Sequence, residues 1–396
     1  VLPDSMHRTV PAIIIAHVWV NLAVVVRTVG ASVAVQDPRL GEAAATLGAS
    51  PARTAWHITL PMLRPALLAS SSVVFLFCFT SFGIVRFLGG PAQPTLEVEI
   101  WRATTQQLDL STASVLAAAQ IVVVTLLLSI WLWVQRRSDV TMSLRTATPL
   151  VRARTRRARI GVASVAIATG TVVLVPLAFM LMRSLRTASG TYSLTAWRAI
   201  FGSAPRLTAG AQAVVAEPWH TVVTSMRIGV TAVAIAVVIA TLAACAINSA
   251  YRFARLLDTA LMLPLGASAV TVGFGLIITF DHRPIDLRGS WLMLPLGQAL
   301  VAVPFAIRVI LPTLRAIDPG QREAAAMLGA SPWRSWWAVD APVVRRALGA
   351  GAGFAFAISL GEFGATSFLT RVGNETAPIA ISRLVARPST LNLAQA

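Results

Sequence analysis

Residues 42–51 read Glu-Ala-Ala-Ala-Thr-Leu-Gly-Ala-Ser-Pro, and residues 323–332 read Glu-Ala-Ala-Ala-Met-Leu-Gly-Ala-Ser-Pro. The two stretches lie 281 positions apart, from position 42 to position 323, and the same offset relates Asp37-Pro38 to Asp318-Pro319. Each stretch is a polar loop between two apolar runs. The chain therefore contains two related halves, and each half carries one copy of this loop.

The composition is typical of a membrane protein and not of a soluble domain. Hydrophobic residues make up 56% of the 396 residues, charged residues only 12%, and the mean hydropathy is +0.72. A chain this apolar is typical of a protein with several membrane spans. The two cysteines, Cys78 and Cys245, lie inside apolar segments, so they indicate neither a disulfide framework nor a metal site.

The basic residues are distributed as in a membrane protein. The formal net charge is +17, and all 33 basic residues are Arg. Such a charge is compatible with nucleic-acid binding, but the Arg residues lie mostly at the ends of apolar runs, where the positive-inside rule places them. We therefore expect a lipid bilayer, and no nucleic acid, as a partner.

The apolar runs have the length of membrane spans. A helix needs about 20 apolar residues to cross a bilayer core of about 30 Å. Eight segments meet this length, at 9–31, 66–88, 113–134, 160–182, 221–248, 257–280, 291–311 and 347–370. Alternating them across the membrane puts both repeated loops on one side, which carries 18 Arg against 10 on the other. The sequence therefore predicts an all-α, multi-pass protein of the prokaryotic plasma membrane, with both loops in the cytoplasm.

The same pattern predicts the domain organisation. We expect 1–134 to be the C-terminal part of the first half, 135–159 to be a basic cytoplasmic linker, and 160–396 to be the second half without its last span. The positive charge of the linker would keep it on the cytoplasmic side, which fixes the orientation of the neighbouring spans, and would bind anionic lipid headgroups. Because Val1 already lies within the first repeat unit, we expect a fragment of a longer tandem protein that lacks spans at both ends.

Each repeated loop is predicted to be a helix–glycine–helix elbow. Asp37 can cap the first helix, with Pro38 in its first turn. Gly48 supplies a left-handed stop, and Ser50-Pro51 starts the second helix. The second copy has equivalent residues at the same offset. One such elbow could be a simple connector, but two copies on one side of a membrane favour two docking points for a two-fold partner.

The first loop matches a known signature. It reads Glu42-Ala-Ala, three residues, Gly48, nine residues, Ile58, one residue and Leu60-Pro61. This pattern resembles the EAA motif, the cytoplasmic signature of binding-protein-dependent ABC importer permeases of the type I fold.

The second loop keeps most of this signature. Glu323, Gly329 and Pro342 are present, whereas Val339 and Ala341 stand where the family usually has Ile and Leu. The resemblance implies that each loop is a coupling helix seated in a cleft on one subunit of an ATP-binding-cassette dimer. ATP-driven closure of that dimer would pull the loops together and switch the spans between inward-open and outward-open states.

The resemblance also implies which residues dock. The predicted docking residues are Glu42, Ala43, Ala44, Gly48, Glu323, Ala324, Ala325 and Gly329. The chain contains no Lys and no phosphate-binding Gly-x-x-x-x-Gly-Lys-Ser/Thr loop, so it binds no ATP itself and ATP hydrolysis would belong to a separate subunit. We expect a non-enzymatic transport subunit without a cofactor of its own.

The tandem arrangement narrows the class of importer. It resembles the fused permeases of the ferric-iron and thiamine importers, and we favour thiamine over iron. The stretch Leu360-Gly361-Glu362-Phe363-Gly364 also resembles sulfate, molybdate and phosphonate permeases, which remain alternatives. In this family an extracytoplasmic binding protein delivers a small polar solute, so such a protein is a further expected partner.

Two residues are candidates for the translocation pathway. Glu362 lies about 15 residues into its predicted span, where a carboxylate is costly and is expected to face the bundle interior or a polar pathway. It could contact a cationic solute or a gate, or it could form a helix–helix hydrogen bond beside Gly361 and Gly364. Ser81 stands at the equivalent position of the first half, so any such site is asymmetric.

Two other classes of protein are less consistent with the sequence. A polytopic membrane transferase would need clustered acids or histidines at one membrane face, and the short group Asp281, His282 and Asp286 is more typical of a turn. A channel would not explain two docking elbows. We predict no catalytic residue and no metal site.

Overall fold

The computed structural model describes most of the chain, and this part is helical. The described residues are 9–90, 93–138, 155–186, 190–201, 218–248, 254, 256–258, 260–261, 268–281, 286–287, 289–371 and 373–386. Within them an isolated bridge between Arg186 and Tyr192 is the only extended pairing. Seven described helices are long and apolar enough to cross a membrane. The predicted all-α polytopic fold is confirmed.

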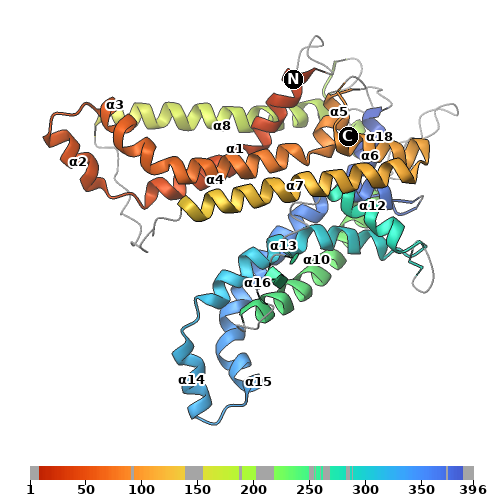
Figure 1. Cartoon of the computed structure of the whole chain (residues 1–396). Helices are drawn as coiled ribbons and strands as arrows, with labels where there is room; N and C mark the ends of the chain where they lie inside the picture. The colour runs from red at the N-terminus through yellow and green to blue at the C-terminus, as the bar shows by residue number, and fades with distance from the viewer. Residues whose placement is uncertain are drawn as a thin grey trace. The chain divides into compact units, whose positions relative to one another are not determined.

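Contacts divide the chain into two compact units (Figure 1). The first unit comprises Val1–Thr95 and Ala118–Met180, and the second comprises Leu96–Ala117 and Leu181–Ala396. These units do not coincide with the predicted halves, because residues 96–117 group with the second unit and most of the helix that begins at Arg156 groups with the first. The half boundaries themselves stay a prediction, since residues 139–154 of the predicted linker lie outside the described residues.

The first unit is built on a pair of long helices. Its elements are α1 (Val10–Ala34), α2 (Pro38–Thr46), α3 (Pro51–Thr54), the π-helical turn η2 (Ala55–Thr59), α4 (Leu60–Phe79), α5 (Phe82–Leu88) and most of α8 (Arg156–Leu185). Helices α1 and α4 pack together, and α2 and α3 lie at one end of this pair (Figure 1). The indole Nε1 of Trp19 in α1 donates to the Val172 carbonyl of α8 at 3.0 Å.

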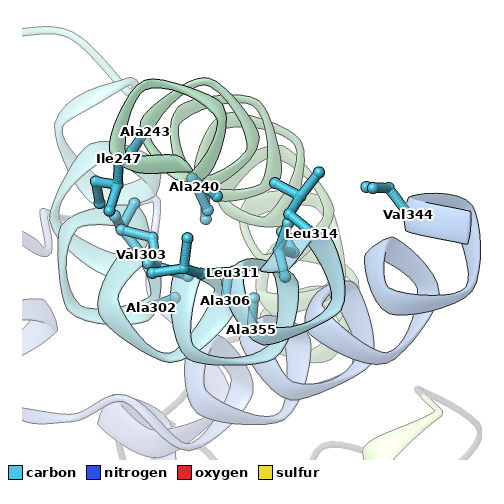
Figure 2. Close-up of a cluster of buried hydrophobic side chains, with 14 of the residues drawn as sticks. Ala240, Ala243, Ile247, Ala302, Val303, Ala306, Leu311, Leu314, Val344 and Ala355 are labelled. Atoms are coloured by element: carbon cyan, nitrogen blue, oxygen red, sulfur yellow. The ribbon is translucent and has the colours of Figure 1, made fainter. Parts of the chain in front are cut away.

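The second unit contains a tightly packed three-helix core. Its described helices of ten or more residues are α10 (Pro218–Asn248), α12 (Ala269–Thr279), α13 (Met293–Arg315), α16 (Ala341–Gly361) and α18 (Ala377–Ala386). Alanines line the contacts of α13 with α10 and α16, and Ala240, Ala306 and Ala355 have no exposed surface (Figure 2). Small side chains let membrane helices approach closely.

The shorter elements of this unit complete the fold. They are α6 (Leu96–Arg102), the π-helical turn η3 (Ala103–Gln107), α9 (Thr195–Ile200), α14 (Pro319–Met327), α15 (Pro332–Ser335), the π-helical turn η4 (Trp336–Asp340) and α17 (Gly364–Leu369). Helix α7 (Leu110–Ser138) begins in this unit and continues into the first. Helices α14 and α15 lie at one end of the α10–α13–α16 core (Figure 1).

Three predicted spans are not single helices. The predicted span 66–88 breaks between α4 and α5, where Ser81 has extended backbone with ψ 99°. The predicted span 347–370 breaks at the equivalent place, where Glu362 has ψ 118° between α16 and α17. The prediction of one continuous helix is therefore wrong in both halves. Hydropathy does not reveal the break, because the residues on both sides of it are apolar.

The predicted span 257–280 also differs. Ser268 has extended backbone and accepts a hydrogen bond from the Thr271 amide at 3.1 Å, so α12 starts afresh at Ala269 and has only 11 residues. Residues 262–267 lie outside the described residues. The prediction of one helix from 257 to 280 is therefore wrong. Seven described helices are long enough to span a membrane, whereas the sequence predicted about eight spans.

The sequence offset of 281 also holds for the three-dimensional elements. Helices α2 and α3 correspond to α14 and α15, the helix break at Ser81 corresponds to that at Glu362, and η2 (55–59) corresponds to η4 (336–340). A π-helical turn is rare and often marks a functional position. Its duplication directly after both loops shows that the two halves share the loop, the turn and the helix that follows.

Candidate functional site

Both repeated loops have the predicted caps. Asp37 Oδ1 accepts from the Arg39 amide at 3.0 Å, and Ser50 Oγ accepts from the Arg53 amide at 3.3 Å. In the second loop Asp318 and Ser331 accept in the same way from amides two and three residues ahead, at 2.9 and 3.4 Å. Each cap satisfies an amide that the first helical turn leaves unpaired. The predicted start of every loop helix is confirmed.

The bend of each loop depends on glycine. Gly48 has φ +81° and Gly329 has φ +79°, in the left-handed region that other residues rarely adopt. The Gly48 amide donates to the Ala45 carbonyl at 3.0 Å, and the next amide donates to the Ala44 carbonyl at 2.9 Å. This pair of bonds is the Schellman motif, and the second loop repeats it at 2.9 and 3.0 Å. The predicted elbow is confirmed in both copies.

The predicted docking residues do not all share one face. Glu42, Ala43, Glu323 and Ala324 are exposed, whereas Ala44 is buried and Ala325 is half-buried. The second Ala of each motif therefore packs inward and holds the elbow, while the Glu and the first Ala are accessible to a partner.

The most exposed apolar residue of each loop was missed by the sequence analysis. Leu47 is 88% exposed and its equivalent Leu328 is 89% exposed, each directly before the bending glycine. A single exposed apolar side chain is common on protein surfaces, so the informative observation here is that the same Leu is exposed at the same place in both loops. The presence of Leu at this position in both copies is the sequence signal that indicates it.

An ion pair between Arg322 and Asp340 braces the second loop. Arg322 Nε in α14 donates to Asp340 Oδ1 in η4 at 2.9 Å, and Asp340 is only 5% exposed. This charged hydrogen bond ties the docking helix to the turn that leads into α16. The first loop has Gly41 and Thr59 at the equivalent positions, so it cannot form this pair.

Aromatic residues are also concentrated at the second loop. Trp333, Trp336 and Trp337 form a cluster with ring centroids 5.0 to 5.9 Å apart. At the equivalent positions of the first loop Trp56 is the single Trp. The two loops therefore share their backbone but not their surroundings.

The two pathway candidates lie in different units and have different environments. Glu362 is 6% exposed; its Oε1 accepts from the Ala365 amide at 2.9 Å, and its Oε2 accepts from the Thr366 amide at 2.8 Å and hydroxyl at 2.6 Å. The carboxylate thus caps the first turn of α17. Ser81 makes no cap bond to α5. A role of either residue in the pathway stays a prediction.

Comparison with known families identifies the class of protein. A sequence profile described as "Binding-protein-dependent transport system inner membrane component" matches residues 1–140 and 236–387. The chain belongs to this family. The two matched segments fit two fused permease halves of a binding-protein-dependent importer, each of which contains one elbow.

Individual relatives are permeases for several solutes. The thiamine transport system permease protein ThiP of Brucella abortus is 27% identical over 360 residues, which cover 90% of this chain and 62% of the relative. The putative 2-aminoethylphosphonate permease protein PhnV of Salmonella typhimurium is 27% identical over 214 residues, covering 54% of this chain and 78% of the relative. The molybdenum permease protein ModB of Escherichia coli is 32% identical over 147 residues, covering 34% and 64%. This chain spans 62% of the length of the thiamine permease.

Proposed function

We propose that this chain is the permease subunit of an ATP-driven importer in the plasma membrane of a prokaryote, and that it carries thiamine from a binding protein into the cytoplasm. The observation that supports the transport role is the duplicated elbow, with the same caps, the same left-handed glycine and the same exposed Leu in both copies. Two equal elbows fit one site on each subunit of an ATPase dimer.

The geometry of the elbow supports a coupling role. Leu47 and Leu328 directly follow the short helices α2 and α14 and are exposed. The capping hydrogen bonds and the Schellman motif hold each of these helices in shape. Burying one such side chain in a partner's cleft would contribute about 1.5–3 kcal/mol. A movement of the elbow would pass through η2 and η4 into α4 and α16, which follow them without a loop. The spans would then alternate between inward-open and outward-open states.

Thiamine is the solute that the comparisons favour. The thiamine permeases match 90% of the chain, whereas the phosphonate and molybdenum permeases match 54% and 34%. Ferric iron remains the second candidate on the resemblance of the tandem arrangement, and phosphonate, sulfate or molybdate are further alternatives. ATP would bind to the partner ATPase.

Uptake by cells tests this proposal directly. Cells that express the full-length gene with its neighbouring ATPase and binding protein are compared with an isogenic deletion, using labelled thiamine and labelled ferric iron in parallel. ATP-dependent thiamine uptake that is lost in the deletion is the expected result. Uptake of iron alone would contradict the assignment of thiamine as the solute but support the assignment to the class of importer permeases. Uptake of neither would favour phosphonate or another small anion as the solute.

A further inference from the structure

A polar cluster is buried between the two long helices of the first unit. Asn21 of α1 is only 4% exposed, and its Nδ2 donates to the His17 carbonyl at 2.9 Å and contacts Cys78 Sγ of α4 at 3.8 Å. A carbonyl oxygen only accepts hydrogen bonds, so the amide nitrogen must face it, which fixes the orientation of the Asn21 side chain. Asn21 Oδ1 is therefore the remaining atom, and it is buried without a hydrogen-bond partner among the described residues.

The imidazole of His17 offers a second such atom. His17 Nδ1 lies 2.9 Å from the Ile13 carbonyl, which can only accept, so Nδ1 carries the proton. In the neutral ring Nε2 is then an acceptor, and it too is buried with no partner in the part of the chain that the structure describes. His17 and Asn21 are four residues apart in one helix, so they lie on the same face of α1. This face presents two unused hydrogen-bond acceptors.

At the equivalent positions of the second half, the polar side chains pair with one another. Gln298, Ala302 and Ser359 stand there in place of His17, Asn21 and Cys78, so the second half has no counterpart of the Asn21 acceptor. Gln298 Oε1 accepts from the Ser359 hydroxyl, and its Nε2 donates to Thr366 Oγ1 at 3.3 Å, which in turn donates to Glu362. Every polar atom of the Gln298 side chain is used. The second half therefore uses Gln298 and Ser359 to join α13, α16 and α17, whereas His17 Nε2 and Asn21 Oδ1 of the first half have no partner among the described residues.

Open acceptors inside a membrane span are costly. A buried polar atom without a partner costs about 1–3 kcal/mol, and the hydrocarbon core offers no water to satisfy it. Polar side chains within spans commonly mark the path of a transported solute. Cys78 places α4 next to Asn21 on this face, so a separation of α1 from α4 would expose the Asn21 acceptor to a solute.

We infer that His17 Nε2 and Asn21 Oδ1 form a solute contact for an N–H group, and this inference rests on the transport function proposed above. Two acceptors on one face match an amino or ammonium group that donates two hydrogen bonds. Thiamine carries such an amino group on its pyrimidine ring. An oxyanion such as molybdate offers acceptors only and would be repelled, so the cluster selects for the chemical class of the solute.

Selectivity between two solutes tests this contact. The full-length transporter, assembled with its ATPase and binding protein in proteoliposomes, is assayed for uptake of thiamine and of an analogue in which hydrogen replaces the pyrimidine amino group. The variants are Asn21→Leu and His17→Phe, which each remove one acceptor at similar volume. The control is Ser70→Ala, because Ser70 is equally buried in α4 but its hydroxyl already donates to the Leu67 carbonyl at 3.0 Å.

We expect each acceptor variant to lower thiamine uptake by about 3–10-fold, the value of one hydrogen bond, while uptake of the analogue stays within about twofold of the unmodified protein. Ser70→Ala should leave the ratio of the two solutes unchanged. A general packing defect would lower both solutes equally, so an unchanged ratio in both acceptor variants overturns the inference.

The controls separate this inference from the proposed function. If the unmodified transporter takes up no thiamine, both the proposed solute and the proposed contact of His17 and Asn21 are wrong. If it takes up thiamine normally but the variants leave the thiamine-to-analogue uptake ratio unchanged, only the proposed contact is wrong. Co-purification of the ATPase verifies assembly of each variant. If one acceptor variant fails to assemble, the ratio measured for the other decides.

Discussion

The first and second loops bend alike but are held differently. Both elbows have a capping Asp, a capping Ser and a left-handed Gly. Only the second is tied to its span by Arg322 and Asp340 and flanked by a Trp cluster. The bend is fixed by neighbouring residues and was retained in both copies, whereas the brace depends on residues 18 positions apart and is present in one. We therefore expect the second loop to transmit force more directly than the first.

The largest effect is expected from removing both elbows. In Gly48→Pro with Gly329→Pro, the proline ring holds φ near about −65°, far from the left-handed values of +81° and +79°, and removes the amide of the Schellman motif. The double variant should insert into membranes normally but fail to bind the ATPase in a pull-down. A normal pull-down would show that the elbows do not dock. Each single variant then reports how much one elbow contributes.

Truncating the exposed tips should have the next largest effect. Leu47→Ala and Leu328→Ala each remove a side chain that is exposed in the free chain, so the thermal stability of the permease should not change. If each side chain is buried on docking, ATPase affinity should fall about 10- to 100-fold, which corresponds to about 1.5–3 kcal/mol. Titration of the ATPase against each variant in detergent measures this. Equal affinity of both variants and the unmodified chain would rule out the tips as contacts.

The helix breaks offer a sharper comparison of the two halves. Glu362→Ala removes the cap of α17 and leaves three donors without their acceptor, so we expect uptake to fall about tenfold from a loss of about 1–2 kcal/mol. Ser81→Ala removes a side chain that caps nothing and should change uptake little. Assembly is followed by ATPase pull-down. Unchanged uptake kinetics in Glu362→Ala would show that transport depends neither on this cap nor on a contact of Glu362 with the solute.

The brace itself should give the smallest effect. Asp340→Ala leaves Arg322 unpaired, but Arg322 is one-third exposed and can reach solvent, so the local loss should be about 1–2 kcal/mol and less than for a fully buried pair. Faster hydrogen exchange of α14 amides, with no change in α2, is the expected result. Thr59→Ala at the equivalent position is the matched control and should change neither helix. Equal exchange in both variants would mean that the ion pair does not brace the loop.

Features that depend on neighbouring residues could be predicted from the sequence. The caps at Asp37 and Ser50 and the bend at Gly48 follow from residue type alone, and the all-α fold follows from hydropathy. The break at Glu362 could not be found in this way, because it depends on a carboxylate that turns back onto amides inside an apolar run. The pair between Arg322 and Asp340 was also missed, because only the folded elbow brings them together.

The duplicated π-helical turns have a consequence for the register of the spans. A π turn contains about one residue more than an α turn, and one residue rotates a helix face by about 100°. The turns at 55–59 and 336–340 therefore determine the rotation of α4 and α16 about their axes relative to the preceding elbows. Deleting His57 from the first turn would keep the caps of its loop and the apolar side chains of α4 while rotating that helix relative to the elbow. The two halves therefore share not only the sequence offset of 281 but also the rotation of the helix that follows each loop, and the insertion or deletion of one residue would change this rotation.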